Sequence, residues 1–197
     1  AILRKLAGLP SVYVPSLYRD TYNDDGTLQS LKPIDSAAPQ RVRRYFITDF
    51  EHAYIPTHPP VPYTQVVFDR IMLEIMRGCT RGCRFCQAGM LYRPVRERSV
   101  ETLVQAAKDS VDCTGYEEIS LSSLSSSDYS HIEELANRLT EELKDKRVSL
   151  SLPSLRVDKF VQDTLTHTQK VKKSSLTFAP EAGTQRLRDV INKNVTE

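Results

Sequence analysis

Long hydrophobic stretches and a strong net charge are both missing from this chain of 197 residues. No apolar run reaches the length of a membrane-spanning helix, so the sequence gives no sign of a membrane span. The formal net charge is only +2, which gives no argument for nucleic acid or an acidic membrane surface as a partner. No secretory signal is visible, and the chain starts at Ala1 without a methionine, so we expect a fragment.

Cysteine is scarce and unevenly placed. The chain has four cysteines, and three of them, Cys79, Cys83 and Cys86, fall within eight residues. Secreted scaffolds held together by disulfides spread their cysteines along a short chain, and this pattern does not match them. We therefore expect a reducing, cytoplasmic environment.

Proline separates a loop-rich beginning from a regular remainder. Eight of the eleven prolines lie between Pro10 and Pro62, together with an Asp-Asp-Gly turn signal. We predict that residues 1–65 form a proline-rich linker, or a wrap over a neighbouring domain, without site chemistry of its own. Within this segment, residues 2–6 suit a short helix and residues 41–50 suit one strand.

Residues 66–197 alternate between strand and helix patterns, and we assign them to one core domain. Apolar runs predict four strands, over residues 70–77, 118–122, 147–152 and 174–179. Apolar stripes with helical spacing follow the strands, and the helix starts are marked by Ser99, Ser130, Asp158 and Thr184. Strand followed by helix, four times over, predicts an α/β fold with a parallel sheet.

Several of these helices carry more detailed signals. The helix after Ser99 has an apolar stripe that stops at Gly115, a residue type favoured just past a helix end. Ser130 and Glu133 form a capping-box pattern at the start of the next helix. The apolar face of the last helix is expected to consist of Leu187, Val190 and Ile191.

Small hydroxyl residues alternate with apolar residues in the predicted strands. The hydroxyl positions are Ser120, Ser122, Ser149, Ser151 and Thr177. Because successive side chains point to opposite faces, the apolar face can lie under the helices while the small polar face leaves room for a ligand. A filled barrel would show branched apolar residues on both faces. We predict a ligand-lined half-barrel; the alternative is a sheet with one face in water.

The three clustered cysteines have the spacing C-x3-C-x2-C, directly after the first predicted strand. Loops at the carboxyl ends of parallel strands carry the active sites of such folds. Gly78 and Gly82 allow a tight turn that brings backbone N–H groups toward sulfur. Cys79, Cys83 and Cys86 are therefore candidates to hold three irons of a [4Fe–4S] cluster.

A cluster of this type normally takes four cysteines, and no fourth lies near these three. One iron is then left open, and an open iron can bind the amino and carboxylate groups of S-adenosylmethionine (SAM). One electron from the cluster cleaves the sulfonium and releases a 5′-deoxyadenosyl radical. The cofactors carry this chemistry, and the protein positions and shields them.

Other uses of the cysteines stay open. Structural zinc requires a fourth ligand, and the spare thiol, Cys113, falls near the end of the first core helix, where we expect a buried or half-buried side chain. His52 and His58 are further donors, in the proline-rich segment. A disulfide plus one free thiol does not suit a reducing compartment. A redox or sensor module that holds a cluster without cleaving SAM is the alternative from another functional class.

The cysteine motif, with Phe85 just before its last cysteine, resembles the radical SAM superfamily, and the resemblance extends from about residue 66 to the end. A narrower group, uncharacterised bacterial members with an upstream cobalamin-binding domain, is similar in the strings Leu73-Glu-Ile-Met-Arg-Gly-Cys79, Cys86-Gln-Ala-Gly-Met-Leu-Tyr-Arg-Pro and Phe178-Ala-Pro-Glu-Ala-Gly-Thr184. The chain lacks an Asp-x-His-x-x-Gly cobalamin motif, so the resemblance implies cobalamin for the full-length protein only.

The resemblance also implies contacts to SAM. Where many members have a Gly-Gly-Glu stretch for the SAM amino group, this chain has a serine run that includes Ser122 and Ser123. Glu181 resembles the polar residue that holds the ribose hydroxyls, a task that suits a carboxylate. Lys193 and Arg156 are candidate cations for the SAM carboxylate. The alternatives are solvated surface charges for these two and a helix N-terminal acid for Glu181.

Superfamily members have a partial barrel of six βα units, and we expect this chain to be truncated after about four. The resemblance implies an enzyme that reductively cleaves SAM, with an electron donor such as flavodoxin or ferredoxin and an unknown substrate. Methyl transfer, methylthio transfer and small-molecule rearrangement are reactions of related enzymes. The basic run from Arg93 to Arg98 could meet an anionic substrate such as RNA, although short mixed runs are usually solvated loops.

Overall fold

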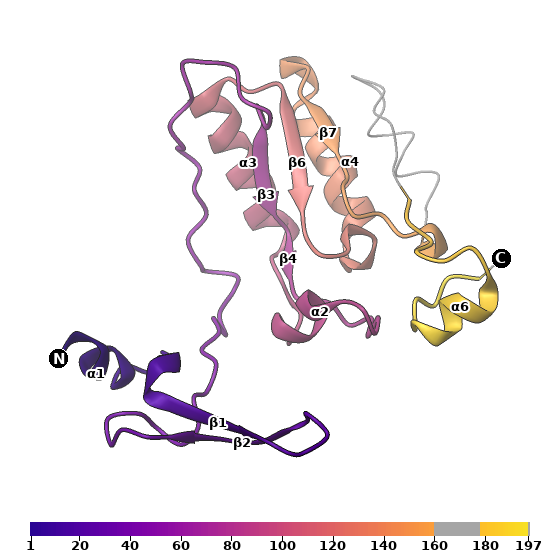
Figure 1. Cartoon of the computed structure of the whole chain (residues 1–197). Helices are drawn as coiled ribbons and strands as arrows, with labels where there is room; N and C mark the ends of the chain where they lie inside the picture. Colours follow the sequence, from indigo (N-terminus) through magenta and orange to yellow (C-terminus); the bar gives the residue numbers. More distant parts are fainter. Residues whose placement is uncertain (160–177, 197) are drawn as a thin grey trace. The chain divides into compact units, whose positions relative to one another are not determined.

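The computed structural model describes residues 1–159 and 178–196 (Figure 1). The chain divides into two compact units, Ala1–Thr48 and Asp49–Glu197, which we call the N-terminal unit and the core. The proline pattern places a boundary at residues 65/66, whereas in the structure residues 49–65 lie with the core.

The N-terminal unit is built on a short helix and a hairpin. Helix α1 (Ile2–Ala7) confirms the predicted helical start. Strands β1 (Tyr18–Tyr22) and β2 (Leu28–Pro33) pair in antiparallel orientation. In the connection, the Asp25 carboxylate accepts hydrogen bonds from the backbone N–H and the hydroxyl of Thr27, at 2.9 and 2.6 Å. Such side-chain bonds to a nearby backbone group stabilise a tight turn.

The predicted strand over residues 41–50 is wrong, because these residues form no strand. A strand needs a partner for its backbone N–H and C=O groups, and β1 and β2 pair with each other instead. The hairpin is absent from the sequence-based prediction. Its signal is the Asp-Asp-Gly turn between two runs that contain tyrosine, threonine and leucine.

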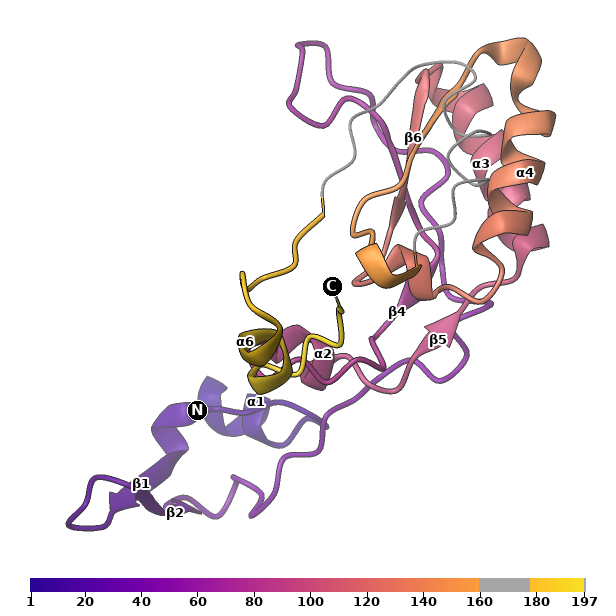
Figure 2. The ribbon, with the colours of Figure 1, turned by 90° about the vertical axis from the view of Figure 1, so that its right-hand side faces the viewer.

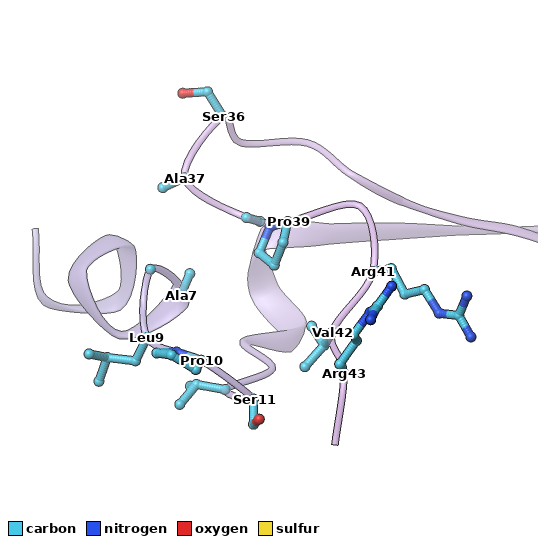
Figure 3. Close-up of a pocket in the computed structure, with 13 residues that line it drawn as sticks. Ala7, Leu9, Pro10, Ser11, Ser36, Ala37, Pro39, Arg41, Val42 and Arg43 are labelled. Carbon is cyan, nitrogen blue, oxygen red and sulfur yellow. The ribbon is translucent and has the colours of Figure 1, made fainter. Parts of the chain in front are cut away.

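A hollow of about 570 Å³ lies within the N-terminal unit (Figure 3). Leu9, Pro10 and Val42 are among its small and apolar lining residues, and the guanidinium of Arg41 extends away from them. None of its lining residues is a cysteine, a histidine or a carboxylate. The hollow therefore offers no side-chain ligand for a metal and no carboxylate or imidazole for acid–base chemistry.

The core contains a sheet of three parallel strands, in the order β3 (Ile71–Glu74), β6 (Glu118–Ser122) and β7 (Ser149–Ser151). Ile71 pairs with Ile119, and Ile119 pairs with Leu150. The first three predicted strands are confirmed. Because they are parallel, their carboxyl ends meet at one edge, where ligand sites form in such sheets.

Two helices, α3 (Val100–Thr114) and α4 (Ile132–Glu142), cover the same face of this sheet (Figures 1 and 2). The hydroxyl of Ser99 accepts a hydrogen bond from the N–H of Thr102 at 3.2 Å and caps α3. Gly115, in a left-handed conformation, ends the helix. Both predicted limits of α3 are confirmed.

The start of α4 differs from the prediction. The residue before the helix is His131, and its side chain makes no capping hydrogen bond, so the capping box predicted at Ser130 is wrong. The backbone N–H of Ser130 donates to the carboxylate of Glu97 at 3.1 Å, which holds this residue outside the helix. Two acidic residues in the first turn, Glu133 and Glu134, still suit the positive end of the helix dipole.

The two faces of the sheet differ as predicted. The face under the helices is part of one apolar cluster, whose most deeply buried members include Leu73, Ile75, Leu103, Leu121 and Leu135. On the opposite face, Met72, Ser120 and Ser151 lie side by side in the register. Met72 is half exposed, whereas Ser120 is buried. Thr177, expected on this face, lies outside the described residues.

Shorter elements surround the carboxyl edge of the sheet. Strand β4 (Met76–Arg77) continues from β3 after Ile75 and pairs antiparallel with β5 (Arg96–Glu97). Helix α2 (Gln87–Leu91) lies between these two strands in sequence. The single-turn 3₁₀ helices are η1 (Pro15–Leu17), η2 (Ser126–Asp128), η3 (Lys144–Lys146) and η4 (Val157–Lys159).

Helix α6 (Gln185–Val190) begins at Thr184, as predicted, but buries a different side. Leu187 and Val190, expected on its apolar face, are 41% and 47% exposed. Arg188 is buried instead, because its guanidinium donates to the carbonyl groups of Val195 and Ala182, at 3.0 and 3.1 Å. The hydrogen-bonding demand of the guanidinium decides which side faces inward.

The predicted helix after Asp158 and residues 174–177 of the predicted fourth strand lie outside the described residues. The described part contains the three parallel strands and no closed barrel. The partial barrel of about four units therefore stays a prediction. Among the helices of the described residues, none combines the length and apolar character that a membrane crossing requires.

Candidate functional site

The three clustered cysteines lie in the loop after β4, at the carboxyl edge of the parallel sheet. Gly78 enters this loop with a φ of 97°. A Cβ atom at this position would stand 2.7 and 2.8 Å from the carbonyl oxygens of Tyr92 and Pro94. Only glycine fits where the two backbone segments cross, and the segment after α2 thus sets the direction in which Cys79 leaves the strand.

All three thiols of the loop are free and partly exposed. The Sγ of Cys79 accepts a hydrogen bond from the N–H of Arg81, and the Sγ of Cys86 accepts one from the N–H of Gly89, both at 3.4 Å. Cys86 thereby caps α2. Backbone N–H groups that donate to sulfur are outer contacts of the kind that orient a metal ligand.

The segment after α6 packs on the cysteine loop from far along the chain. Nδ2 of Asn192 donates to the carbonyl of Gly82 at 2.8 Å, across 110 positions of sequence. The N–H of Arg84 donates to the carbonyl of Ile191 at 2.9 Å. Gly82 has a φ of 111°, and a Cβ there would lie 3.3 Å from the Asn192 amide. These hydrogen bonds join the cysteine loop and the segment after α6 into one local structure.

This packing brings three predicted cofactor contacts together. Nζ of Lys193 lies 3.1 Å from Oε1 of Glu181 and 5.9 Å from the centroid of the Phe85 ring. The Lys193 side chain is 13% exposed, whereas Phe85 is 53% exposed. The first turn of α6 contains no acidic residue, so Glu181 is not a helix N-terminal acid. Glu181 has a φ of 67°, a conformation that costs a non-glycine residue about 1–2 kcal/mol.

Arg156, the other predicted cation, is buried and fully engaged by the protein. Its guanidinium donates to both carboxylate oxygens of Asp158, at 2.8 and 3.0 Å, and to the carbonyl of Lys193 at 2.9 Å. Burial alone would raise the pKa of Asp158, but the hydrogen bonds from Arg156 and the charges of Arg156 and Arg81 hold this pKa below its usual value. Arg156 therefore positions the backbone that carries Lys193.

Arg81, inside the cysteine motif, links the cysteine loop to the segment that follows β6. Its guanidinium donates to both carboxylate oxygens of Asp128, with an Nε to Oδ2 distance of 2.8 Å, and lies 3.5 Å from Asp158. These bonds to Asp128 raise the pKa of Arg81. The two side chains are only 19% and 8% exposed. A pair with two parallel charge-assisted bonds fixes orientation as well as distance.

The serine run after β6 bonds largely to itself. The hydroxyls of Ser123 and Ser126 are 2.9 Å apart, and the hydroxyl of Ser125 donates to Asp128 at 2.8 Å. The carbonyl of Ser122 accepts the N–H of Ile75 at 3.1 Å and extends the sheet toward the cysteine loop. Ser122 and Ser123 thus lie at the predicted edge, and their contact with SAM stays a prediction.

The basic run after the cysteines is used by the fold. Arg96 donates from Nε to the carbonyl of Pro94 and from its terminal nitrogen to the carbonyl of Tyr92, both at 3.1 Å. Arg98 is only 3% exposed. These two arginines stabilise the return of the chain from the loop, and an anionic substrate at this run stays a prediction.

Comparison with known families agrees with this geometry. The family model described as "Radical SAM superfamily" matches residues 73–197. The chain belongs to the radical SAM superfamily. The matched residues run from β3 through the cysteine loop to α6, so the match includes both segments that meet at the candidate site.

A similar protein comes from the archaeon Methanocaldococcus jannaschii. It is "Uncharacterized protein MJ0966", and it is 37% identical to this radical SAM chain over 142 residues. The alignment covers 72% of this chain and 30% of that protein. The chain therefore spans less than a third of the curated relative that it matches.

The ligands present suit the [4Fe–4S] cluster that the radical SAM superfamily implies. Within the residues that the structure describes, no three Cys, His, Asp or Glu side chains are grouped to hold a single metal ion. A cubane cluster of this kind takes one thiolate on each of three irons. The loop supplies three free thiols, and backbone N–H groups donate to two of the sulfurs, so the donor set suits such a cluster.

The other residues considered as a fourth zinc ligand are Cys113, His52 and His58. Cys113 is exposed on α3, so the prediction of a buried or half-buried thiol is wrong. The helix turns the stripe that includes Val104 and Val111 inward, and this orientation leaves Cys113 outside. His52 and His58 hydrogen-bond locally, to Asp49 and Thr57, each at 2.9 Å.

Asn192, Arg81 and Asp128 also form contacts of the candidate site and are absent from the sequence-based prediction. Asn192 follows α6 and adopts a φ of 55°, and asparagine directly after a helix is a known signal for this conformation. Arg81 carries a weaker signal, a charge between two motif cysteines. Nothing in the sequence indicates that its partner is Asp128, which lies 47 positions away.

Proposed function

We propose that this chain is the catalytic core of a radical SAM enzyme, with a [4Fe–4S] cluster on Cys79, Cys83 and Cys86 and SAM beside it. When both are bound, the chemistry they supply is reductive cleavage of the SAM sulfonium to a 5′-deoxyadenosyl radical. The observation that carries this proposal is the packing of the segment after α6 on the cysteine loop. It accompanies the placement of the Lys193 and Glu181 pair beside Phe85, within the cysteine motif.

Lys193 and Glu181 have suitable chemistry for the two ends of SAM. The ammonium of Lys193 can donate to the amino-acid carboxylate, and the carboxylate of Glu181 can accept the ribose hydroxyls. The two side chains bond to each other at 3.1 Å in the structure. A ligand that brings both a carboxylate and hydroxyls replaces this bond, because its carboxylate pairs with the ammonium and its hydroxyls donate to the Glu181 carboxylate.

Phe85 and the partly exposed thiols meet two further needs of the proposed site, an apolar surface for the ligand and access for an electron donor. The Phe85 ring is half exposed and lies under the Lys193 ammonium, so it offers an apolar surface beside the cation. The thiols are partly exposed, which lets an electron donor of the flavodoxin or ferredoxin type approach the cluster. The hydroxyl of Ser123 and the end of β6 at Ser122 complete the proposed edge of the SAM site.

Anaerobic reconstitution with iron and sulfide, followed by EPR of the reduced protein with and without SAM, tests this function. We expect a [4Fe–4S] signal that changes when SAM is added, and 5′-deoxyadenosine in the product. The blank is the triple variant Cys79→Ala, Cys83→Ala, Cys86→Ala. We expect Lys193→Gln to keep the cluster but to weaken SAM binding by about tenfold, the loss of one charge-assisted contact.

Lys146→Gln is the matched control, because Lys146 also pairs with a carboxylate, that of Asp112, on the surface of the core. It should leave SAM binding unchanged. A wild-type cluster whose signal does not respond to SAM would favour the redox module instead. Zinc bound without any cluster would refute the proposal.

A further inference from the structure

Phe50 lies at the start of the core and is only 2% exposed. The guanidinium carbons of Arg77 and Arg98 lie over its ring, 4.9 and 4.2 Å from the centroid. A cation is attracted to an aromatic face, and the attraction grows when water is excluded. Arg77 directly precedes the cysteine loop and Arg98 follows β5, so one ring contacts both ends of the cysteine-bearing segment.

The two arginines depend on this ring to different degrees. Arg77 donates to both carboxylate oxygens of Glu74, at 2.8 and 2.6 Å. Arg98 is 3% exposed and has no carboxylate partner in the described structure; its terminal nitrogen donates to the carbonyls of Glu51 and Ala53, at 3.1 and 2.9 Å. Its Nε is the one buried side-chain nitrogen or oxygen without a hydrogen-bond partner among residues 1–159 and 178–196. The Phe50 face is therefore a main compensation for this buried cation.

Glu51, the residue after Phe50, binds the start of helix α3. Its carboxylate accepts hydrogen bonds from the N–H and hydroxyl of Ser99, at 2.7 and 2.6 Å, and from the hydroxyl of Thr102 at 2.6 Å. A carboxylate at this position also suits the positive end of α3. Residues 50 and 51 thus contact the strand end before the cysteines and the helix start after them.

We propose that residues 49–53, which we call the strap, are a positioning element of the radical SAM site. The strap holds Arg77 and Arg98 in place, and these residues set the entry and the exit of the cysteine-bearing segment. The part of the inference that concerns cofactors rests on the function proposed above. The family match begins at residue 73 and the proline pattern sets its boundary at 65/66, so neither indicates that the strap belongs to the site.

Hydrogen exchange of the cofactor-free protein tests the positioning by itself. We expect Phe50→Leu, which keeps an apolar side chain but removes the ring, to speed exchange in residues 76–86 by about tenfold, with α4 unchanged. Phe68→Leu is the matched control, because the guanidinium of Arg70 also lies over the Phe68 ring, at 5.3 Å, but that ring is 66% exposed. Glu51→Gln, a milder variant, should speed exchange at the start of α3.

A second readout connects the strap to the cluster. After reconstitution, we expect Phe50→Leu to lose iron to a ferrous chelator about tenfold faster than wild type, as when an outer contact of a metal ligand is removed. Its EPR response to SAM should be altered, which a simple loss of core stability does not produce. Phe68→Leu should match wild type in both measurements.

The outcomes separate this inference from the proposed function. If hydrogen exchange in residues 76–86 is unchanged in Phe50→Leu, the proposal that the strap positions this segment is wrong, whatever the iron loss and EPR measurements show. A general increase that includes α4 would overturn it too, because Phe50 would then support the core as a whole. If the wild type takes up no cluster, the proposed function fails, while faster exchange confined to residues 76–86 would still establish the strap as a positioning element.

Discussion

The N-terminal unit and the core bury apolar side chains to very different degrees. The N-terminal unit buries only Ala7, Val14 and Ala38, and it exposes large side chains that include Ile2, Leu9, Tyr22, Leu28 and Leu31. The core buries one continuous apolar cluster between its sheet and the helices α3 and α4. Burial of apolar area is the main stabilising contribution to folding, and it is concentrated in the core.

This difference shows what holds each unit together. In the N-terminal unit, the bonds stay within the unit: Asp25 with Thr27, the β1–β2 ladder, and the pair of Arg4 with Asp35 at 2.9 Å. In the core, packing fixes the strands, and buried ion pairs fix the loops at the carboxyl edge. A rigid sheet that carries polar loops suits a site whose ligands must be held in place.

The largest contrast is expected from leucine truncations in the two units. Leu121 in β6 is fully buried, and we expect Leu121→Ala to lower the free energy of unfolding by about 2–5 kcal/mol. Leu31 in β2 is 47% exposed, and Leu31→Ala should cost no more than about 0.5 kcal/mol. Urea unfolding followed by circular dichroism measures both. Equal effects would mean that the two units share one apolar core.

A smaller contrast is expected from two glycines with positive φ. Gly78→Ala places a methyl group against two carbonyl oxygens in the core, and we expect a loss of about 1–3 kcal/mol together with poorer cluster retention. Gly26 in the hairpin has a φ of 79°, and no atom lies within 4 Å of the place that an added methyl group would take, so Gly26→Ala should leave the unfolding of the core unchanged. Thermal unfolding and iron content measure these effects. A tolerated Gly78→Ala would contradict the tight crossing at Tyr92 and Pro94.

The elements that the sequence predicts well are those whose signals are local. Helix α3 carries its start at Ser99, its stop at Gly115 and its stripe within one continuous segment, and all three agree with the structure. Helix α6 carries a start signal at Thr184, which is correct, but the buried side depends on Arg188 and on carbonyl partners just outside the helix, which its apolar stripe does not reveal. The false strand over residues 41–50 has the same cause, because a pattern does not reveal which partner is available.

The candidate site likewise combines features that the sequence reveals with contacts that it does not. The cysteine spacing, and Lys193 and Glu181 as candidate contacts, are recognisable from the sequence, and the structure pairs Lys193 with Glu181 beside Phe85 of the cysteine motif. The contacts that bring them there are not recognisable, because Asn192 reaches Gly82 across 110 positions and Phe50 reaches Arg98 across a long segment. Tertiary contacts of this kind follow from the fold of the whole core and leave no regular spacing in the sequence.

The smallest effect concerns pH and the strap residue Glu51. Burial alone would raise the pKa of Glu51, but the hydrogen bonds from Ser99 and Thr102 outweigh it and hold the pKa below its ordinary value. A carboxyl whose pKa is lowered by folding stabilises the folded state above its unfolded pKa, about 4.3, and loses this contribution as the pH falls through the folded pKa. We therefore expect core stability to fall below about pH 4.3, by no more than about 1 kcal/mol from this group.

Glu51→Gln should lower the core stability at pH 7 and flatten its decline between about pH 5 and pH 3, as followed by the helical circular dichroism signal in urea. Asp35→Asn is the matched change in the N-terminal unit, where the N–H of Ala37 and the side chain of Arg4 lower the pKa of Asp35. Because that carboxylate bonds only within its own unit, its removal should leave the pH profile of the core unchanged. A core profile that responds equally to both variants would show that the two units unfold together, and the contrast between them would then be one of packing alone.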